Sequence, residues 1–393
     1  MDDHVKEIGP YVRRIRWAIH RHPELSLHET QTAALVESEL RTFGLEVRRV
    51  AGTGVVGLLR GAKPGRTVAL RADMDALPVQ EKTGCVSSST VDGVMHACGH
   101  DAHTAILLGA ARILSSMKRE ISGNVKFLFQ PAEEDNPVGG AKLLIQAGAL
   151  EDPKVDMIFA LHVWPDLATG KVGIRPGPIM AASDRVTLRV LGKSSHGSLP
   201  HQGVDAVVAA CQIVVALQTI TSRNLNPLES AVLTFGTITG GTRYNILANE
   251  TTLEGTVRTF STEARDMVEA RLNQLAPKVA EGLGAVCEVD YIRGYPAVVN
   301  HPTAVDVLRA AGEDTVGREG VVLPEYPSMV AEDFAFYLEK VPGALFWLGC
   351  TAEGEVKKSL HSPEFLPDEN CLGIGVEMMV RTALRCLEIS QNV

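Results

Sequence analysis

The order of the secondary-structure elements predicted between residues 184 and 293 restricts the fold of this chain more than any other feature. The apolar patterns predict a strand at DRVTLRVLGK, a helix over 204–221, strands at SAVLTFGTI and TTLEGTVRTF, a helix over 262–282 and a strand at AVCEVDYIR. This βαββαβ order is that of a ferredoxin-like domain, and it is complete within the segment. We therefore expect residues 184–296 to form a domain of their own.

The segments on either side of this domain alternate strands with helices. Apolar or β-branched runs predict strands at TVALRAD, NVKFLFQ and VDMIFALHV, and helical spacing predicts helices over 27–43, after His100 and from about 372. Apolar strands that alternate with helices indicate a mainly parallel sheet with helices on both faces. We expect residues 1–183 and 297–393 to form one α/β domain, into which the ferredoxin-like domain is inserted.

Composition narrows the class of function. A net charge of -9 without a cluster of Lys and Arg argues against a nucleic-acid partner. The charged N-terminus lacks the apolar core of a signal peptide, and we identify no apolar run long enough to span a membrane. The seven cysteines are scattered and odd in number, which fits reduced thiols better than a disulfide framework. These features predict a cytoplasmic protein that binds neither nucleic acid nor a membrane.

The stretch MHACGHDAH, residues 95–103, is rich in groups that bind metals or move protons. Cys98 and His100 lie two apart, so in the extended turn before the predicted helix they can converge on one ion. Thiolate and imidazole are both good ligands for zinc-type metals. The alternatives are a histidine-rich turn around a buried cysteine, or a cysteine nucleophile.

A second candidate is FQPAEED, in which Pro131 ends a strand and places Glu133 and Glu134 side by side in a loop. Neighbouring carboxylates on an extended backbone point to opposite sides. One can therefore bind a metal while the other carries a proton. The alternative is an exposed acidic loop without a function.

Other candidates follow predicted strands: Asp73 and Asp75 in RADMDALP, His162 in FALHVWP and His361 in SLHSPEF. Each of them also fits a structural histidine or a solvated loop residue. However, ligands of open α/β sheets bind at the carboxyl ends of the strands. Side chains that follow strands of the same predicted sheet would gather along this edge, namely Asp73, residues 98–101, Glu133, Glu134 and His162. Five potential ligands and a spare carboxylate suit two metal ions and a general base better than one closed structural zinc site.

Seven motifs occur along the chain in this order: RADMDALP, MHACGHDAH, FQPAEED, SSHGSLPHQGVDAV, GGTRYNILANETTLEGTVRTF, MVAEDFAFYL and LHSPEF. Together they resemble the M20 metallopeptidase family, specifically its amidohydrolase branch of hippurate hydrolases, auxin-conjugate hydrolases and related aminoacylases and carboxypeptidases. The resemblance extends over about residues 10–385. It implies a two-metal catalytic domain and a ferredoxin-like lid domain that commonly mediates dimerisation, hence a homodimer.

The resemblance also implies roles for single residues of the catalytic domain. Glu133 would be the general base, Asp73 would orient a metal ligand, and Asp101 would be a supporting acid. Much of the wider family has a histidine in an H-x-D motif, where this chain has Arg71-Ala-Asp73. The implied metal ligands are Cys98, His100, Glu134, His162 and His361.

In the lid, His196 matches a histidine that in relatives reaches towards the scissile carbonyl, often from the partner subunit. Asn245 and Arg258 fall in stretches associated with binding of the substrate's free carboxylate. The chain reads GKSSHGSLPH where many relatives have glycines before this histidine, a departure that affects the lid hinge and substrate fit.

The implied reaction is hydrolysis of an N-acyl amino acid to a carboxylate and a free amino acid. It would use two divalent ions, of which a thiolate ligand favours Zn²⁺, while Mn²⁺, Co²⁺ and Ni²⁺ are also compatible. Two rivals stay open: a hydrolase in which Cys98 is the nucleophile, and a non-catalytic binder on the same fold. The presence of Glu133 and of all the implied ligands argues against the binder.

Overall fold

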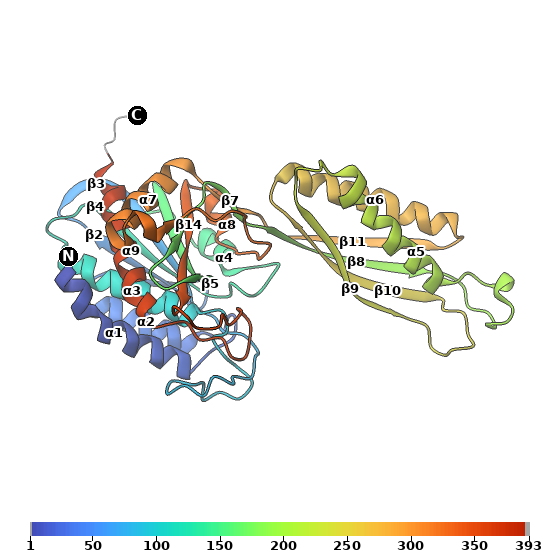
Figure 1. Cartoon of the computed structure of the whole chain (residues 1–393), viewed down its shortest axis with the longest axis horizontal. Coiled ribbons are helices and arrows are strands. Elements are labelled where there is room, and N and C mark those ends of the chain that lie inside the picture. Colours follow the sequence, from blue (N-terminus) through green and yellow to red (C-terminus); the bar gives the residue numbers. More distant parts are fainter. Residues whose placement is uncertain (1, 390–393) are drawn as a thin grey trace. The chain divides into compact units, whose positions relative to one another are not determined.

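The computed structural model describes residues 2–389 and divides the chain into two compact units, which are described separately (Figure 1). Unit 1 consists of Met1–Ile179, Val298–Tyr326 and Asp333–Val393. Unit 2 consists of Met180–Ala297 and Pro327–Glu332. An insertion centred on residues 184–296 was expected from the sequence, whereas the short second segment of unit 2 was not. In that segment the carbonyls of Ser328 and Val330 accept hydrogen bonds from the Ala181 N–H, a long-range pairing that local patterns do not encode.

Unit 1 is built on an eight-stranded sheet in the order β1-β2-β4-β3-β5-β14-β6-β13. The strands are β1 (Glu46–Val50), β2 (Gly54–Arg60), β3 (Lys63–Asp73), β4 (Ser122–Gln130), β5 (Met157–Ala168), β6 (Val172–Gly173), β13 (Val321–Val322) and β14 (Gly343–Thr351). The central strands β4, β3, β5 and β14 are parallel, while β1 and β2 pair antiparallel with their neighbours. Strand β6 is antiparallel to β14 and parallel to β13. Two further short strands, β7 (Gly177–Met180) and β12 (Val298–Asn300), form a separate ladder.

Helices cover both faces of this sheet, as predicted (Figure 1). On one face, Val68 and Leu70 of β3 share a core with Ile106 and Val376. The helices that contribute to this core are α1 (Asp2–Arg21), α2 (Thr30–Thr42), α3 (His100–Ser116), α7 (Pro302–Val316) and α9 (Asn370–Glu388). The opposite face carries α4 (Gly140–Gln146) and α8 (Ala335–Leu338). The sequence analysis predicted no helix in the region of α1, although its buried Ile8, Val12, Ile15 and Ile19 recur at helical spacing.

Unit 2 confirms the predicted βαββαβ order. Its elements are β8 (Ala182–Leu191), α5 (Ala206–Thr219), β9 (Ala231–Gly240), β10 (Glu250–Thr259), α6 (Thr262–Gly282) and β11 (Val286–Tyr295). The antiparallel sheet has the order β11-β8-β10-β9, and α5 and α6 pack on it. Both helices begin at a capping side chain: Asp205 accepts from the amides of Val207 and Val208, and Ser261 accepts from Ala264.

The prediction that no apolar run is long enough to span a membrane is wrong. Among the described residues, Ala206–Asn224 is long and apolar enough to cross a membrane by length and composition, with a mean hydropathy of 1.4. In the structure this stretch forms α5 and a π-helical turn, Ile220–Asn224. Its Ile213 and Leu217 are buried in the core of unit 2. Because core helices of soluble proteins pass the same test, the stretch is weak evidence for a membrane span.

Candidate active site

The candidate residues of unit 1 lie at the carboxyl ends of β3 and β4 and at the neighbouring position of β5. Asp73 ends β3 and pairs with Gln130, the last residue of β4. On the other side of β3, Arg71 pairs with Ala160, so His162 lies level with the end of β3. The prediction that His162 ends its own strand is wrong, because β5 continues to Ala168. The parallel register nevertheless brings these polar side chains to one edge, as expected for open α/β sheets.

The donor atoms of all five predicted ligands converge. Cys98 Sγ lies 3.5 Å from His162 Nε2, and His361 Nε2 lies 3.2 Å from Glu134 Oε1. Three triads have donor atoms within 4.8 Å of one another: Cys98, His100 and His162; Cys98, Glu134 and His361; and His100, Glu133 and Glu134. Cys98, His100 and Glu134 each belong to two of these triads, so the donor atoms form one continuous cluster.

The histidine tautomers fit this role. The Nδ1 of His162 lies 2.7 Å from the Val163 carbonyl, and the Nδ1 of His100 lies 2.9 Å from the Asp75 carbonyl. A carbonyl only accepts, so each Nδ1 carries the proton and each Nε2 presents its lone pair. His100 Nε2 is buried and has no hydrogen-bond partner among residues 2–389. A buried nitrogen of this kind is costly unless a ligand engages it. The thiolate, imidazole and carboxylate donors therefore fit two zinc-type ions.

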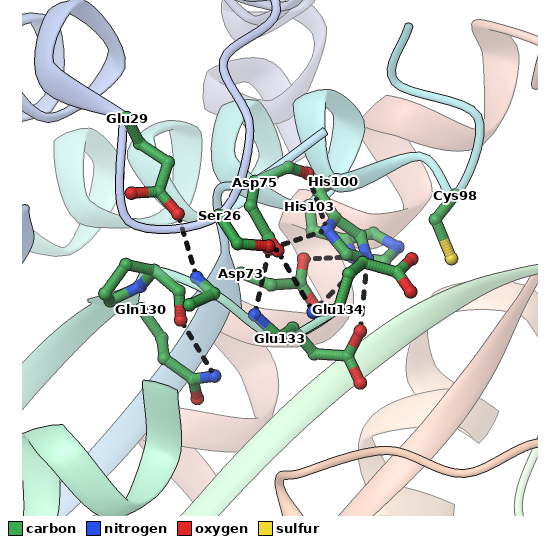
Figure 2. Close-up of polar contacts among 12 residues, drawn as sticks. Ser26, Glu29, Asp73, Asp75, Cys98, His100, His103, Gln130, Glu133 and Glu134 are labelled. Carbon is green, nitrogen blue, oxygen red and sulfur yellow. Dashed lines mark hydrogen bonds and ion pairs between the residues drawn. The ribbon is translucent and has the colours of Figure 1, made fainter. Parts of the chain in front are cut away.

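Asp75 connects the loop of Glu133 and Glu134 to His100 (Figure 2). Its carboxylate accepts from the backbone amides of Glu133 and Glu134, both at 3.0 Å, and from Ser26 Oγ at 2.6 Å. It also lies 3.3 Å from His100 Nδ1. Burial opposes its ionisation, but these hydrogen bonds and His100 lower the pKa of Asp75 below its usual value. The sequence identified Asp75 only as a strand-end acid; its contacts with the other motifs could not be read from the chain.

Asp73 was expected to orient a metal ligand, but the histidine that it contacts most closely, His103, is not one of the predicted ligands. Its Oδ1 lies 2.7 Å from His103 Nδ1, and His103 Nε2 accepts from the Val163 amide at 2.9 Å. Both nitrogens of His103 are thus used within the protein. Asp73 Oδ2 accepts from Arg71 at 2.7 Å and approaches His100 Nε2 only to 3.8 Å. Among the predicted ligands, the close carboxylate contact through Nδ1 is made by Asp75 to His100.

A buried network that the sequence did not reveal supports the loop of Glu133. Asp333 accepts from Arg71 and Gln130, both at 2.8 Å, and from the Ala141 amide at 2.9 Å. The amide of Asp333 itself points at Glu133 Oε1, at 3.4 Å. On the other side of the loop, Glu29 accepts from the Ala132 amide at 2.8 Å. The loop is therefore held from both ends before any substrate arrives.

The electrostatics of the cluster favour a bound cation. Burial and the carboxylates of Glu134 and Glu133 raise the pKa of Cys98 well above that of a free thiol. Burial alone would neutralise His100, but Asp73 and Asp75 outweigh it and raise the pKa of His100 to about 10. Both shifts reflect an excess of negative charge, which divalent ions would neutralise.

Asp101 faces away from this cluster. Its Oδ2 accepts from His20 Nδ1 at 2.8 Å and from Arg16 Nε at 2.9 Å. Burial opposes its charge, but Arg16 and His20 hold the pKa of Asp101 far below its usual value. Asp101 thus anchors the first turn of α3, directly after His100, to α1. This is consistent with the expected supporting role.

The candidate residues in unit 2 differ from those in unit 1 in their burial and in their contacts. His196 is exposed, and its Nδ1 accepts from Ser198 Oγ at 2.7 Å. The next residue, Gly197, donates its amide to the Asn245 carbonyl at 2.8 Å, so these two segments lie side by side. Asn245 Oδ1 is buried without a hydrogen-bond partner in the described chain. Arg258 lies in β10 between Ser183 and Val232, and burial lowers its pKa.

Comparisons with known proteins identify the family. The model of Peptidase family M20/M25/M40 matches residues 69–385. An N-acyl-L-amino acid amidohydrolase of Geobacillus stearothermophilus is 45% identical over 298 residues, covering 76% of this chain and 80% of the relative. An N-acetyl-L-cysteine deacetylase of Bacillus subtilis is 39% identical over 379 residues, covering 96% of this chain and 88% of the relative. The crystal structure of the Bacillus subtilis YXEP protein, described as a dinuclear metal binding peptidase from the M20 family, matches with a TM-score of 0.85 and 34% identity over 98% of this chain and 99% of that one. The chain therefore belongs to peptidase family M20/M25/M40.

Proposed function

We propose that this protein hydrolyses the amide bond of N-acyl amino acids, releasing a carboxylate and a free amino acid in a metal-dependent reaction. The observation that carries the proposal is the convergence of five metal-ligand side chains around Glu133 at one edge of the sheet. The names of two relatives, an amidohydrolase and a deacetylase of N-acylated amino acids, support this substrate class. Because all seven cysteines are free, we place the enzyme in the cytoplasm.

Two divalent ions would be held by Cys98, His100, Glu134, His162 and His361. When bound, such ions polarise a carbonyl as Lewis acids and lower the pKa of water. The thiol of Cys98 favours zinc among the candidate metals, because thiolates prefer soft or borderline ions.

Glu133 would act as the general base and then as the general acid. It would remove a proton from the attacking water and later deliver it to the departing amine nitrogen, so the proton is conserved over the cycle. Its position is suited to this task because the Asp333 amide and Asp75, which binds the Glu133 amide, hold the loop on either side. Asp73 would support the site by holding His103 and Arg71.

Unit 2 would contribute to substrate binding and to stabilisation of the transition state. His196 is exposed and free to meet a substrate, and we assign it the stabilisation of the developing oxyanion. Asn245 and Arg258 would bind the free carboxylate of the amino acid. We further propose a homodimer through unit 2, where α5 exposes the apolar side chains of Val208 and Val215.

The rival reaction, with Cys98 as nucleophile, fits the electrostatics poorly. A cysteine nucleophile needs a thiolate, which a protonated histidine partner stabilises. Burial and Glu134 raise the pKa of Cys98, and burial and His103 lower the pKa of His162 well below its usual value. Both shifts favour the neutral thiol and the neutral imidazole, so the pair is poorly suited to nucleophilic attack.

The test is a metal-reconstitution assay. The chain is stripped with a chelator, reloaded with Zn²⁺, Mn²⁺ or Co²⁺, and incubated with a panel of N-acetyl and N-benzoyl amino acids and short dipeptides, while release of free amino acid is measured. We expect activity on N-acyl amino acids that the chelator abolishes and divalent metal restores. Activity that survives complete metal removal, or cleavage confined to dipeptides, would refute the proposal.

A further inference from the structure

A second group of metal-ligand side chains lies in unit 1 and shares no residue with the five proposed ligands. It consists of His20, in the last turn of α1, and of Glu81 and Cys85, in the irregular segment between β3 and α3. The sequence motifs did not single out any of the three. Their donor atoms lie within 4.8 Å of one another.

The spacing of these atoms suits a single small ion. Glu81 Oε1 lies 3.4 Å from His20 Nε2 and 3.9 Å from Cys85 Sγ. Around a tetrahedral zinc with bonds of about 2.0–2.3 Å, ligand atoms lie about 3.3–3.7 Å apart, a range that includes the first distance and ends just short of the second. We propose that His20, Glu81 and Cys85 bind one zinc-type divalent ion through three protein ligands, at a site separate from the proposed catalytic pair.

The orientation of His20 supports this assignment. The ring is fully buried, and its Nδ1 lies 2.8 Å from Asp101 Oδ2, so Nε2 is directed towards Glu81 and Cys85. A carboxylate behind the imidazole is the usual arrangement for a metal-binding histidine, because it fixes the ring and increases its basicity. Arg16 holds Asp101 in turn.

The other two ligands are also held in place by their neighbours. Glu81 Oε2 accepts from the Ser89 amide at 2.6 Å, while Oε1 faces His20 and Cys85 and accepts from the Thr83 hydroxyl. The hydroxyls of Ser87 and Ser88 lie 3.4 and 3.6 Å from Cys85 Sγ. Burial opposes ionisation of Cys85, but hydrogen bonds from these hydroxyls and from Thr83 lower its pKa, which favours the thiolate that binds metal.

The ligand chemistry selects the class of ion. One imidazole, one carboxylate and one thiolate suit zinc and related transition metals, whereas calcium and magnesium prefer oxygen ligands alone. Without an ion, a proton on His20 balances the negative charge of Asp101 and Glu81. Burial opposes this proton, but the two carboxylates raise the pKa of His20 to about 9. A divalent ion would replace this proton and join the end of α1 to the segment that leads into Cys98.

The first experiment counts zinc on the full-length chain. Chelator-stripped protein is saturated with ZnCl₂, freed of unbound metal by gel filtration and measured by elemental analysis. We expect three zinc ions per wild-type chain, two in Cys85→Ser and three in the control Cys211→Ser, which alters an exposed cysteine of α5. An equal number of ions in the wild type and in Cys85→Ser would overturn the site. One ion in the wild type and none in Cys85→Ser would keep this site and refute the dinuclear one.

The second experiment measures the reactivity of the Cys85 thiol directly. The rate of iodoacetamide labelling at each cysteine is followed by peptide mass spectrometry, with and without zinc. At a zinc concentration ten times the dissociation constant, labelling of Cys85 should slow about tenfold, because only the metal-free fraction reacts. Cys211 serves as the internal control and should react at an unchanged rate. The protection should disappear in Glu81→Gln. Equal protection of both cysteines, or protection of Cys85 that persists in Glu81→Gln, would contradict the proposed site.

Discussion

The two units position their candidate residues in opposite ways. In unit 1 the general-base candidate Glu133 is buried; its amide donates to Asp75, and its carboxylate accepts from the Asp333 amide. In unit 2 His196 is exposed, and within residues 2–389 its ring forms hydrogen bonds with the amide and the hydroxyl of Ser198, two residues away. Unit 1 therefore supplies a preorganised site, whereas His196 remains free to engage a substrate when one is present.

Unit 2 does contain a buried charge pair, but it serves the fold. Asp184 accepts from Arg265 and from the Tyr291 hydroxyl, and it also binds the Gly294 amide at 3.0 Å. These contacts tie β8 to α6 and β11 at one end of the sheet. Buried charge thus stabilises a catalytic loop in unit 1 and the junction of three elements in unit 2.

The largest effect should come from the most rigidly held residue. Glu133→Gln removes the base and leaves the five ligands, so kcat should fall by about 10²–10⁴-fold at full metal occupancy. Steady-state kinetics combined with elemental analysis check this expectation. Glu134→Gln is the matched control, because it should lose metal as well as activity. Turnover near that of the wild type in metal-loaded Glu133→Gln would refute the assignment.

A smaller effect is expected from unit 2. His196→Ala should lower kcat by about 10²–10³-fold, the usual contribution of one oxyanion donor, with little change in KM, because the contact is made in the transition state. Metal content should stay unchanged. If KM rises and kcat does not fall, His196 binds the ground state and the comparison between the units needs revision.

The same variants also test for a dimer in which His196 serves the partner's site. Mixing inactive His196→Ala with inactive Glu133→Gln should restore partial activity, because each mixed dimer has one site with both groups intact. Subunit exchange must first be shown, for example with differently tagged chains. Exchange without recovered activity would place His196 at the site of its own subunit or outside the reaction.

A moderate effect on metal affinity is expected at Cys98. Cys98→Ser should weaken zinc binding, because a serine hydroxyl does not ionise as a thiol does. Loss of an outer partner of a metal ligand typically costs about 10–100-fold in affinity, and loss of a ligand should cost at least as much. Competition with a chromogenic chelator measures the change. Normal zinc affinity with complete loss of activity would favour the cysteine-nucleophile reaction.

The smallest effects concern stability within unit 1. Asp333→Asn removes a buried charge that binds Arg71 and should lower the free energy of unfolding by at least about 2 kcal/mol. Asp166→Asn, which breaks the exposed pair with Lys357, should cost less than about 1 kcal/mol. All three tryptophans, Trp17, Trp164 and Trp347, belong to unit 1, so their fluorescence in urea reports this unit alone. Equal costs for the two variants would remove the proposed importance of the buried network.

Much of the fold could be predicted because periodicity is a local property. The apolar runs of β3, β4 and β5 and the complete βαββαβ order of unit 2 were legible along the chain. The return of Pro327–Glu332 to unit 2 was not, since it depends on backbone pairing with Ala181, far away in sequence. The sequence analysis also did not identify Ala206–Asn224 as a stretch long and apolar enough to cross a membrane, because polar residues interrupt its apolar run.

The sequence by itself determined which chemical groups are available: a thiol, imidazoles and paired carboxylates, placed after strands that share an edge. Only the tertiary structure decided which of them meet. His100 presents a free Nε2 to the cluster, whereas His103, one turn later on α3, uses both nitrogens on Asp73 and Val163. Asp73 and Asp75 are two residues apart, yet the first lies at the end of β3 and the second beyond it, where it reaches the amides of Glu133 and Glu134. Residue type sets what a side chain can bind, but its partners come from distant segments whose approach depends on packing of the whole sheet.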